Sequence, residues 1–317
     1  MRLLRARRGS LLLVTLWLIA VLAVLAVAIS RFLSLEIRLA AYRAAREQAR
    51  ALARGGVYLA MERLAQDAAA PETGGAAYDW LSDEWAAFPQ ADPSADPSRW
   101  TLAAGAGKFV IQIRDEERRL DLNAASAEQL ARLTGDAALA QAIVDARDAP
   151  DPAEDLPGAA PPYFAKNAPF AAPEELGDLP GMQAEPYALL AARTSPYRRS
   201  TDPINLNTAP ADVLRAAGLA DSTVGLVLGF RERGVFQQAG VVVLEALKDG
   251  AGVDLTGTPD GNLLISNLFG VASATFTVTV EGRVAQPPVT ARVEAVIRRE
   301  GCEEGQPAPC VLAWREG

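Results

Sequence analysis

The sequence has 317 residues, a formal net charge of −8 and no histidine. This length allows two domains, and the acidic balance disfavours binding to nucleic acid or to anionic lipid headgroups. The absence of histidine removes the commonest general base and metal ligand. The two cysteines, Cys302 and Cys310, therefore make a poor zinc site.

The N-terminus combines a basic segment with a long apolar run. The run extends from Leu11 to Ile29, and its only polar side chain is that of Thr15. As a helix it would be about 28 Å long, which matches the hydrocarbon thickness of a bilayer. The run therefore predicts a membrane span, with the preceding arginines on the cytoplasmic side: Arg2, Arg5, Arg7 and Arg8.

This stretch has three interpretations. Ala26-Val27-Ala28 has the small residues that precede signal-peptide cleavage, but the apolar run exceeds the usual signal-peptide core of about 7 to 15 residues. A one-pass anchor is the second interpretation. In the third, Arg8-Gly9-Ser10 directly before the run resembles the processing site of the type IV prepilin class. That resemblance implies a cut between Gly9 and Ser10 that leaves the apolar helix on the mature protein.

Val14 occupies a position at which most members of that class carry a glutamate. A carboxylate inside the bilayer needs a partner, and in that class the partner is the N-terminal amine of the preceding subunit. A subunit with valine there is suited to having no predecessor. In this respect the sequence resembles the K-type minor pseudopilins of type II secretion, which sit at the tip of the pseudopilus. The alternative is that Val14 is an ordinary apolar residue of a membrane anchor.

From Arg31 to Asp67 the sequence has no proline and is rich in strong helix formers. We therefore expect one N-terminal helix over residues 10–70, with a possible bend at Gly55-Gly56. Its expected apolar stripe consists of Leu35, Leu39, Tyr42, Leu52, Tyr58, Leu59 and Leu64. Its expected solvent-facing side consists of Arg38, Arg43, Arg46 and Arg50.

Residues 71–100 contain four prolines and are expected to be irregular, with their tryptophans as packing anchors. The four prolines are Pro71, Pro89, Pro93 and Pro97, and the tryptophans are Trp80, Trp85 and Trp100. The segment from Lys108 to Arg114 alternates and predicts a strand that ends in an acidic run.

The sequence then contains an internal repeat. The segment from Arg119 to Leu133 (RLDLNAASAEQLARL) is repeated 84 residues later, from Pro203 to Ala217 (PINLNTAPADVLRAA). Asn123 and Asn207 hold equivalent places before alanine-rich helices, which predicts a role for an Asn or the following Ser or Thr in helix initiation. The region 119–268 is expected to consist mainly of short helices and loops.

The second copy also resembles a helix-hairpin-helix module, from Ile204 to Phe236. Many such modules bind DNA because the N–H groups of a glycine-rich hairpin hold a phosphate. The hairpin of this chain, residues 217–221, has one glycine and ends in Asp221, which would repel a phosphate. A structural use of the hairpin is therefore favoured over DNA binding.

Near the C-terminus two segments alternate with period two, from Ser273 to Val284 and from Val289 to Glu300. With the strand at 108–114 they should form a sheet on the N-terminal helix. Cys302 and Cys310 bracket a turn before a last strand. A disulfide between them is expected in an oxidising compartment.

The order of these segments resembles the K-type minor pseudopilin family over nearly the whole chain, from Arg8 to Trp314. The resemblance implies an α+β pilin-like fold, in which a long N-terminal transmembrane helix packs on an antiparallel sheet, with a large all-α insertion domain. The expected boundaries are a leader at 1–9, the helix at 10–70, a pilin-like domain from 71–118 and 269–317, and the insertion at 119–268.

The family further implies a non-enzymatic subunit at the pseudopilus tip that initiates or caps assembly for the export of folded proteins across the outer membrane. It would cross the bacterial inner membrane once, with the bulk of the chain in the periplasm. Expected partners are other minor pseudopilins in a hetero-oligomeric tip complex, the prepilin peptidase, secreted substrates and the secretin, but no nucleic acid. The alternative function is a membrane-anchored helix-hairpin-helix DNA receptor of the DNA-uptake type.

An enzymatic role finds no support in the sequence because no serine or cysteine can pair with a histidine. One oxygen-rich group could hold calcium, although its spacing is not that of an EF-hand loop. The group consists of Asp249, Asp254, Asp260 and Asn262. No other cofactor is expected.

Overall fold

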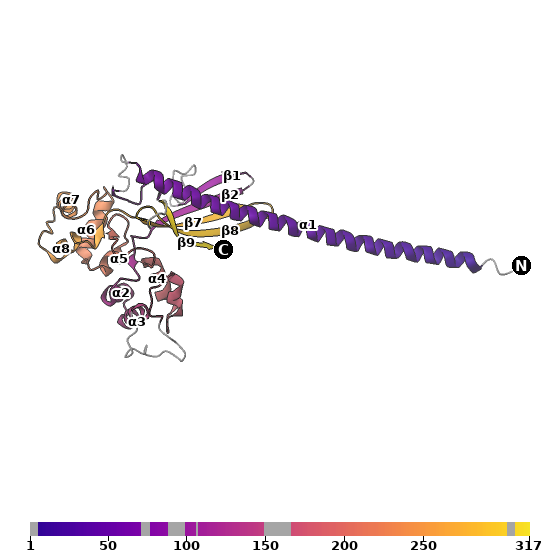
Figure 1. Ribbon diagram of the computed structural model, residues 1–317, viewed down its shortest axis with the longest axis horizontal. Helices are drawn as coiled ribbons and strands as arrows, with labels where there is room; N and C mark the ends of the chain where they lie inside the picture. Colours follow the sequence, from indigo (N-terminus) through magenta and orange to yellow (C-terminus); the bar gives the residue numbers. More distant parts are fainter. Residues whose placement is uncertain (1–5, 71–76, 88–98, 106, 149–165, 303–307) are drawn as a thin grey trace.

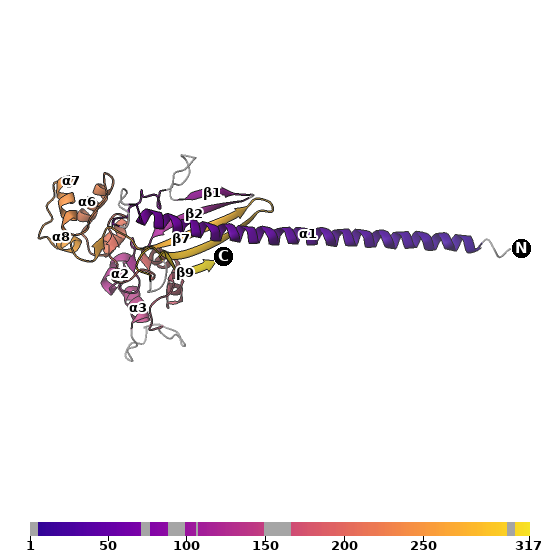
Figure 2. The ribbon, with the colours of Figure 1, turned by 45° about the horizontal axis from the view of Figure 1, so that its top comes forward.

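The computed structural model describes residues 6–70, 77–87, 99–105, 107–148, 166–302 and 308–317, with side chains from Leu11 onward. A long helix runs from the N-terminus along an antiparallel sheet (Figure 1). We call the sheet and the second half of this helix the body. A cluster of short helices lies at the end of the body away from the N-terminus. A second view shows the same arrangement, with most of the first half of the helix extending beyond the body (Figure 2).

Helix α1 extends without interruption over 63 residues, Ala6–Ala68. The expected single helix is therefore present, and Gly55-Gly56 does not break it. Between Leu11 and Ala68 the helix contains an 18-residue window with a mean hydropathy of 3.0, none of it buried. By length and composition this helix is able to cross a membrane.

Five strands form one antiparallel sheet in the order β1-β2-β7-β8-β9. Their bounds are Trp100–Ala104, Gly107–Asp115, Thr275–Val284, Val289–Arg298 and Cys310–Glu316. The three strands expected from alternation are β2, β7 and β8, and the last strand is β9. Strand β1 was not expected, since it lies at the end of the proline-rich stretch.

Helix α1 packs on β2, β7 and β8 through its second half. The contact is close because both surfaces carry small residues. A Cβ atom built on Gly282 would lie 2.0 Å from the carbonyl oxygen of Ala49, and one built on Gly56 would lie 2.5 Å from Val280. Real Cβ atoms do not approach neighbours this closely, so both glycines are required for the helix to reach the sheet.

The expected apolar stripe of α1 is therefore partly wrong. Leu64 is buried, and Leu52 and Leu59 are half-buried, as expected. The exposed members of the stripe are Leu35, Leu39, Tyr42 and Tyr58. The residues that make the contact are instead mainly alanines: Ala45, Ala49, Ala53, Val57 and Ala60. Large side chains would hold the helix away from the sheet, and Leu35, Leu39 and Tyr42 lie where no sheet covers the helix.

Trp85 anchors the segment that follows α1 to the core between helix and sheet. It is buried and meets the ring of Phe276 edge-on, with ring centroids 5.0 Å apart. Its indole N–H donates to Asp83 Oδ2 at 3.2 Å. The packing role expected for this tryptophan is confirmed.

The chain between β2 and β7 forms the helical segment. Its helices are α2 Ala127–Thr134, α3 Ala137–Arg147, η3 Pro173–Asp178, α4 Ala184–Arg193, α5 Ala211–Ala216, α6 Asp221–Arg231, α7 Val241–Ala251 and α8 Pro259–Leu264. They share one apolar core that includes Leu130, Ile143, Leu190, Leu214 and Val227.

The expectation of an all-α insertion is correct in its main character but omits two short parallel strand pairs. Strand β3 (Leu120–Asp121) pairs with β4 (Thr194–Ser195). Strand β5 (Ile204–Asn205) pairs with β6 (Phe269–Gly270). Each strand has two residues, which is too short for an alternation pattern to be visible in the sequence.

Candidate functional site

The first half of α1 forms a large uncovered surface. Every described side chain from Leu11 to Ala44 is exposed except that of Val21, which is half-buried. Leu11 and Ile37, near the two ends of this stretch, are both 69% exposed. A protein surface this apolar is normally covered by lipid or by another protein.

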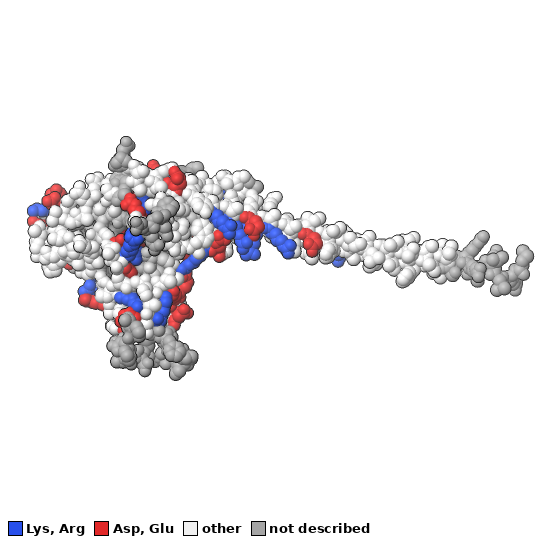
Figure 3. All heavy atoms as spheres, in the orientation of Figure 1, with Lys and Arg blue, Asp and Glu red and all other residues white. Residues whose placement is uncertain are grey.

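The apolar surface continues beyond the predicted span, where it is joined by basic residues. Phe32 and Leu35 are 62% and 65% exposed. Arg38, Arg43 and Arg46 follow on the same stretch of helix and are exposed. Figure 3 shows basic side chains along the part of α1 that leaves the body. A partner helix could cover the leucines while acidic groups meet the arginines.

The predicted processing site lies at the start of α1. Gly9 and Ser10 belong to the helix backbone, but their side chains lie outside the described residues, so cleavage between them remains a prediction. Val14 is 63% exposed on the helix. The first acidic residue of the chain is Glu36, so the apolar run from Leu11 to Ile29 carries no carboxylate.

A buried arginine connects the end of α1 to the sheet. Arg299 donates from Nη1 to Asp67 Oδ2 and to Asp79 Oδ1, each at 2.9 Å. Its Nη2 donates to Asp79 Oδ2 at 2.9 Å and to the carbonyl oxygen of Ser273 at 2.8 Å. The guanidinium also lies 5.2 Å from the centroid of the Phe276 ring. One cation thus joins α1, the following segment and the edge of β7.

The helical segment is held on this junction by further buried polar groups. Asn205 Nδ2 donates to Ser273 Oγ at 2.7 Å and to the carbonyl oxygen of Asp79 at 3.2 Å. The hydroxyl of Thr208 donates to Asp115 Oδ2. Because such bonds are directional, they fix the orientation of the helical segment on the body.

Burial changes the acidity of these groups. It raises the pKa of Asp79 to about 7, although the charge of Arg299 opposes the shift. It also raises the pKa of Glu117 well above its ordinary value, and the nearby charge of Asp115 adds to that shift. Glu117 accepts a hydrogen bond from the N–H of Thr275 at 3.0 Å. These buried groups connect the helical segment to the sheet, and their burial disfavours the ionised forms of Asp79 and Glu117.

The internal repeat corresponds to two similar structural units. We call residues 119–148 with 166–196 the first unit and residues 203–271 the second unit. Asn123 Oδ1 accepts from the N–H of Phe170 at 2.7 Å, and its Nδ2 donates to the Phe170 carbonyl at 3.0 Å. Asn207 makes the same two bonds to Phe236, both at 2.9 Å.

Neither asparagine caps a helix, so the predicted role in initiation is wrong for them. Ser126 caps α2 together with Gln129, and Pro210 occupies the N-cap position of α5 without a side-chain bond. Each asparagine instead ties its own strand-to-helix turn to a distant backbone segment. A local sequence pattern cannot distinguish these two uses, because the partner lies far along the chain.

Two arginines with equivalent roles were not predicted. Arg147 ends α3 and donates to the carbonyl oxygen of Ala125. Arg231 ends α6 and donates to the carbonyl oxygen of Ala209. The two arginines are 84 residues apart, as are the two alanines. Extending the alignment of the internal repeat beyond Leu133 would therefore have found both arginines.

The hairpin of the second unit uses its backbone internally. Gly218 has φ +117°, a conformation that favours glycine. The N–H of Ala220 donates to Asp260 Oδ2 at 3.1 Å, and Arg215 forms an ion pair with Asp221. One hairpin N–H group, the kind of donor that holds a phosphate in DNA-binding hairpins, thus binds an internal carboxylate instead.

The candidate calcium ligands are not brought together. Asp254 pairs with Lys248 at 2.8 Å and accepts from the N–H of Thr256, while Asp260 binds Ala220. Among the residues that the structure describes, no group of three or more acidic or cysteine side chains is arranged to hold a metal ion. The predicted disulfide between Cys302 and Cys310 is present.

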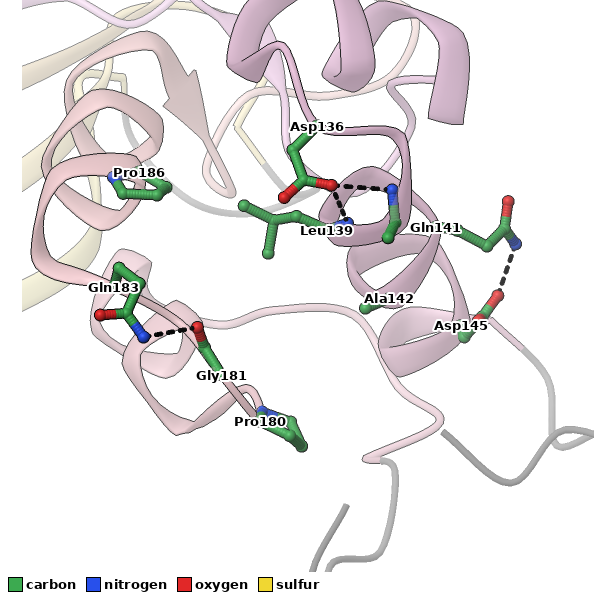
Figure 4. Close-up of a pocket in the computed structure, with 10 residues that line it drawn as sticks. Asp136, Leu139, Gln141, Ala142, Asp145, Pro180, Gly181, Gln183 and Pro186 are labelled. Carbon is green, nitrogen blue, oxygen red and sulfur yellow. Dashed lines mark hydrogen bonds between the residues drawn. The ribbon is translucent and has the colours of Figure 1, made fainter. Parts of the chain in front are cut away.

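A cavity of about 410 Å³ lies between α3 and the turn that precedes α4 (Figure 4). Its polar side chains already have partners within α3 or, for Gln183, in the turn before α4. Asp136 Oδ1 accepts from the N–H groups of Ala138 and Leu139, and Gln141 donates to Asp145. What remains for a ligand is mainly apolar wall.

The described architecture is an α+β pilin-like fold with a helical insertion, as predicted. No family model matches the chain, and no curated protein matches its sequence. Among solved structures, it is similar to a chain of the GspK-GspI-GspJ complex of the type 2 secretion system from enterotoxigenic Escherichia coli. The TM-score is 0.64 at 18% identity, over 86% of this chain and 96% of that chain.

Proposed function

We propose that this protein is a non-enzymatic minor pseudopilin of the K type, part of a type II secretion system. The observation that carries the proposal is the first half of α1, which is helical and uncovered from Leu11 to Ala44 and carries no charge from Leu11 to Ile29. Such a helix needs a membrane before assembly and other subunits after it. The similar structure comes from a complex of pseudopilins, which supports neighbours of that kind.

A position at the tip of the pseudopilus is the second part of the proposal. Val14 offers no carboxylate to the amine of a preceding subunit, whereas the amine of Ser10 can serve a following one. The helical segment lies at the end of the body away from the N-terminus (Figure 1). There it would not separate the α1 helices of neighbouring subunits. Other minor pseudopilins would bind below it along α1, and the chain would initiate or cap assembly.

The proposed location follows from the same helix. The chain would cross the inner membrane once with its body in the periplasm, where the disulfide is stable. A prepilin peptidase would cut between Gly9 and Ser10. N-terminal sequencing of protein extracted from membranes checks this step. Ser10 as the first residue supports it, and Ile29 would indicate a signal peptide instead.

Site-directed cross-linking of the full chain tests the assembly. Because both native cysteines are in a disulfide, a single added cysteine reports on its own surroundings. Leu39→Cys lies on the uncovered half of α1, and Val241→Cys lies on the helical segment; the native side chains are 41% and 60% exposed. We expect the first to cross-link to other minor pseudopilins and the second to remain free. Equal cross-linking at both positions would contradict a tip placement.

The DNA-receptor alternative has less support. Its hairpin would have to bind a phosphate where Asp260 already accepts the N–H of Ala220, next to the charge of Asp221. The net charge of −8 also opposes DNA. Titration of the full chain with duplex DNA at low and high salt separates the two functions, and tight binding that weakens steeply with salt would favour the receptor.

A further inference from the structure

The two units differ in the carboxylates that lie near their equivalent arginines. In the first unit burial lowers the pKa of Arg147, and the carboxylates of Asp121 and Asp148 oppose that shift. The position equivalent to Asp121 in the second unit is Asn205, which carries no charge. The position equivalent to Asp148 is Glu232, which keeps a carboxylate, so Arg231 lacks only the counterpart of Asp121.

Arg231 forms no ion pair within the described residues. Its Nη1 donates to the carbonyl oxygen of Ala209, and neither an ion pair nor a second hydrogen bond links it to the part of the chain that the structure describes. None of its nitrogens is among the described buried atoms that lack a partner, so the remaining N–H groups are open to solvent. Burial, and to a smaller extent the charge of Arg118, lowers the pKa of Arg231 to about 10.

Arg231 belongs to the wall of a pocket. The pocket has a volume of about 350 Å³ and lies between α6 and the segment after α1. Its other lining residues include Trp80, Leu81, Ser82, Asn207 and Leu228. Its charged lining residues are Arg231 and Glu232. One cation, one carboxylate, two amide or hydroxyl side chains and a mainly apolar wall suit a small polar group on an apolar stem.

We propose that this pocket binds a carboxylate, with Arg231 as its charge partner and Trp80 and Leu228 in contact with the apolar part of the ligand. A carboxylate accepts two parallel N–H bonds from a guanidinium and would supply the missing negative charge. A doubly charged phosphate fits less well, because one arginine faces it and Glu232 also lines the pocket. The carboxylate could come from a small organic acid or from an acidic side chain of a neighbouring protein. This inference does not rest on the pseudopilin proposal.

Saturation-transfer NMR with propionate tests the site on the full chain in detergent micelles. Propionamide is the matched control ligand, since it has nearly the same shape without the charge. We expect a saturation signal on the methyl group of propionate and a signal about tenfold weaker on that of propionamide, because the charge-assisted pair is lost. Equal signals from the two ligands would overturn the proposal.

Variants of the chain locate the binding. Arg231→Met should weaken propionate binding by about tenfold, and Arg147→Met, at the equivalent position of the first unit, should leave it within about twofold. Ser82→Glu provides a test that does not depend on removing a structural arginine. Ser82 is exposed and lines the pocket, so its new carboxylate should reach Arg231 and exclude propionate. Unchanged binding to Ser82→Glu would place the ligand elsewhere.

The two sources of the carboxylate are distinguished by competition. Purified neighbouring pseudopilins are added to the chain in the presence of propionate. If a neighbour supplies the acidic side chain, its binding abolishes the propionate signal, and Arg231→Met weakens the complex. If the natural ligand is a small acid, the signal persists in the complex. In either case the pocket binds a carboxylate, and the proposal fails only if propionate does not bind through Arg231.

Discussion

The first and second units share one framework but face different surroundings. Each begins with a two-residue strand, turns on an asparagine that holds a distant phenylalanine backbone, and ends its second helix with an arginine that binds a turn carbonyl. The first unit meets the sheet through an exposed ion pair of Glu174 with Arg315 on β9. The second unit also carries Asn205, which is bonded to the junction with the sheet.

The position occupied by Asp121 and Asn205 shows what the difference achieves. Both side chains accept the N–H of the asparagine two residues later, at 2.7 and 2.9 Å. Only an amide also has N–H groups, and Asn205 donates these to Ser273 and Asp79. The shared role requires an oxygen, and the added role requires a donor. The two units thus share one framework. An amide nitrogen in place of a carboxylate oxygen gives the second unit its bonds to Ser273 and Asp79.

Exchanging these two residues should produce the largest effect. Asn205→Asp would place a buried carboxylate near Asp115 and Asp79 and remove both donated bonds, so we expect a loss of about 3 kcal/mol in the free energy of unfolding. Asp121→Asn keeps the oxygen that accepts the Asn123 N–H, and it should cost about 1 kcal/mol or less. Denaturant unfolding of the full chain in micelles, followed by tryptophan fluorescence, measures both.

The same pair of variants can also contradict the comparison. If Asn205→Asp were tolerated as well as Asp121→Asn, the amide donors would not be what holds the second unit on the body. A protonated aspartate could imitate the amide at low pH. The measurement at pH 8 is therefore the decisive one, because there the new carboxyl group either ionises or stays protonated at a cost in free energy.

The asparagines themselves should give a smaller and more local effect. Asn207→Ala removes two bonds to the backbone of Phe236 at a site that is only 3% exposed, and we expect a loss of about 2 kcal/mol. Asn123→Ala removes the same bonds at a half-buried site, where water can replace them, so about 1 kcal/mol is expected. Hydrogen exchange measured by mass spectrometry should show lost protection at Phe236 in one variant and at Phe170 in the other. Loss of protection throughout the segment in both would contradict independent roles.

Much of the fold could be predicted because its signals are local. The composition of residues 31–67 predicts the extension of α1, and period-two alternation predicts β2, β7 and β8. The close pair of cysteines predicts the disulfide. In each case the pattern and its cause lie within one continuous stretch of sequence.

The other features depend on contacts between distant segments. The packing face of α1 was predicted from its large apolar residues, whereas the sheet requires small ones such as Ala49 because Gly282 lies directly opposite. The bonds of Asn123 span 47 residues, and no local pattern reveals them. Arg231 was missed for a different reason, since the two copies of the internal repeat were aligned only as far as their first helix.

The pH dependence of stability should give the smallest of the three effects, and it concerns the second unit's contact with the body. Burial raises the pKa of Asp79 to about 7, above its ordinary value of 3.8. Because the folded pKa is the higher one, the stabilising contribution of this group is complete below about pH 4 and is lost as the pH rises through 7. Between pH 6 and pH 8 we expect the free energy of unfolding to fall by about 1 kcal/mol from this residue.

Asp79→Asn isolates that contribution. The variant loses its charge interaction with Arg299, so its stability at any one pH is not informative. The slope of stability against pH is informative, because asparagine does not titrate. We expect the slope between pH 6 and pH 8 to be shallower than in the parent chain, whereas the acids Asp83 and Glu117 remain in both proteins. Identical slopes would mean that Asp79 stays ionised in the folded state. Arg299 would then outweigh burial, and the joint that holds the second unit would be insensitive to pH.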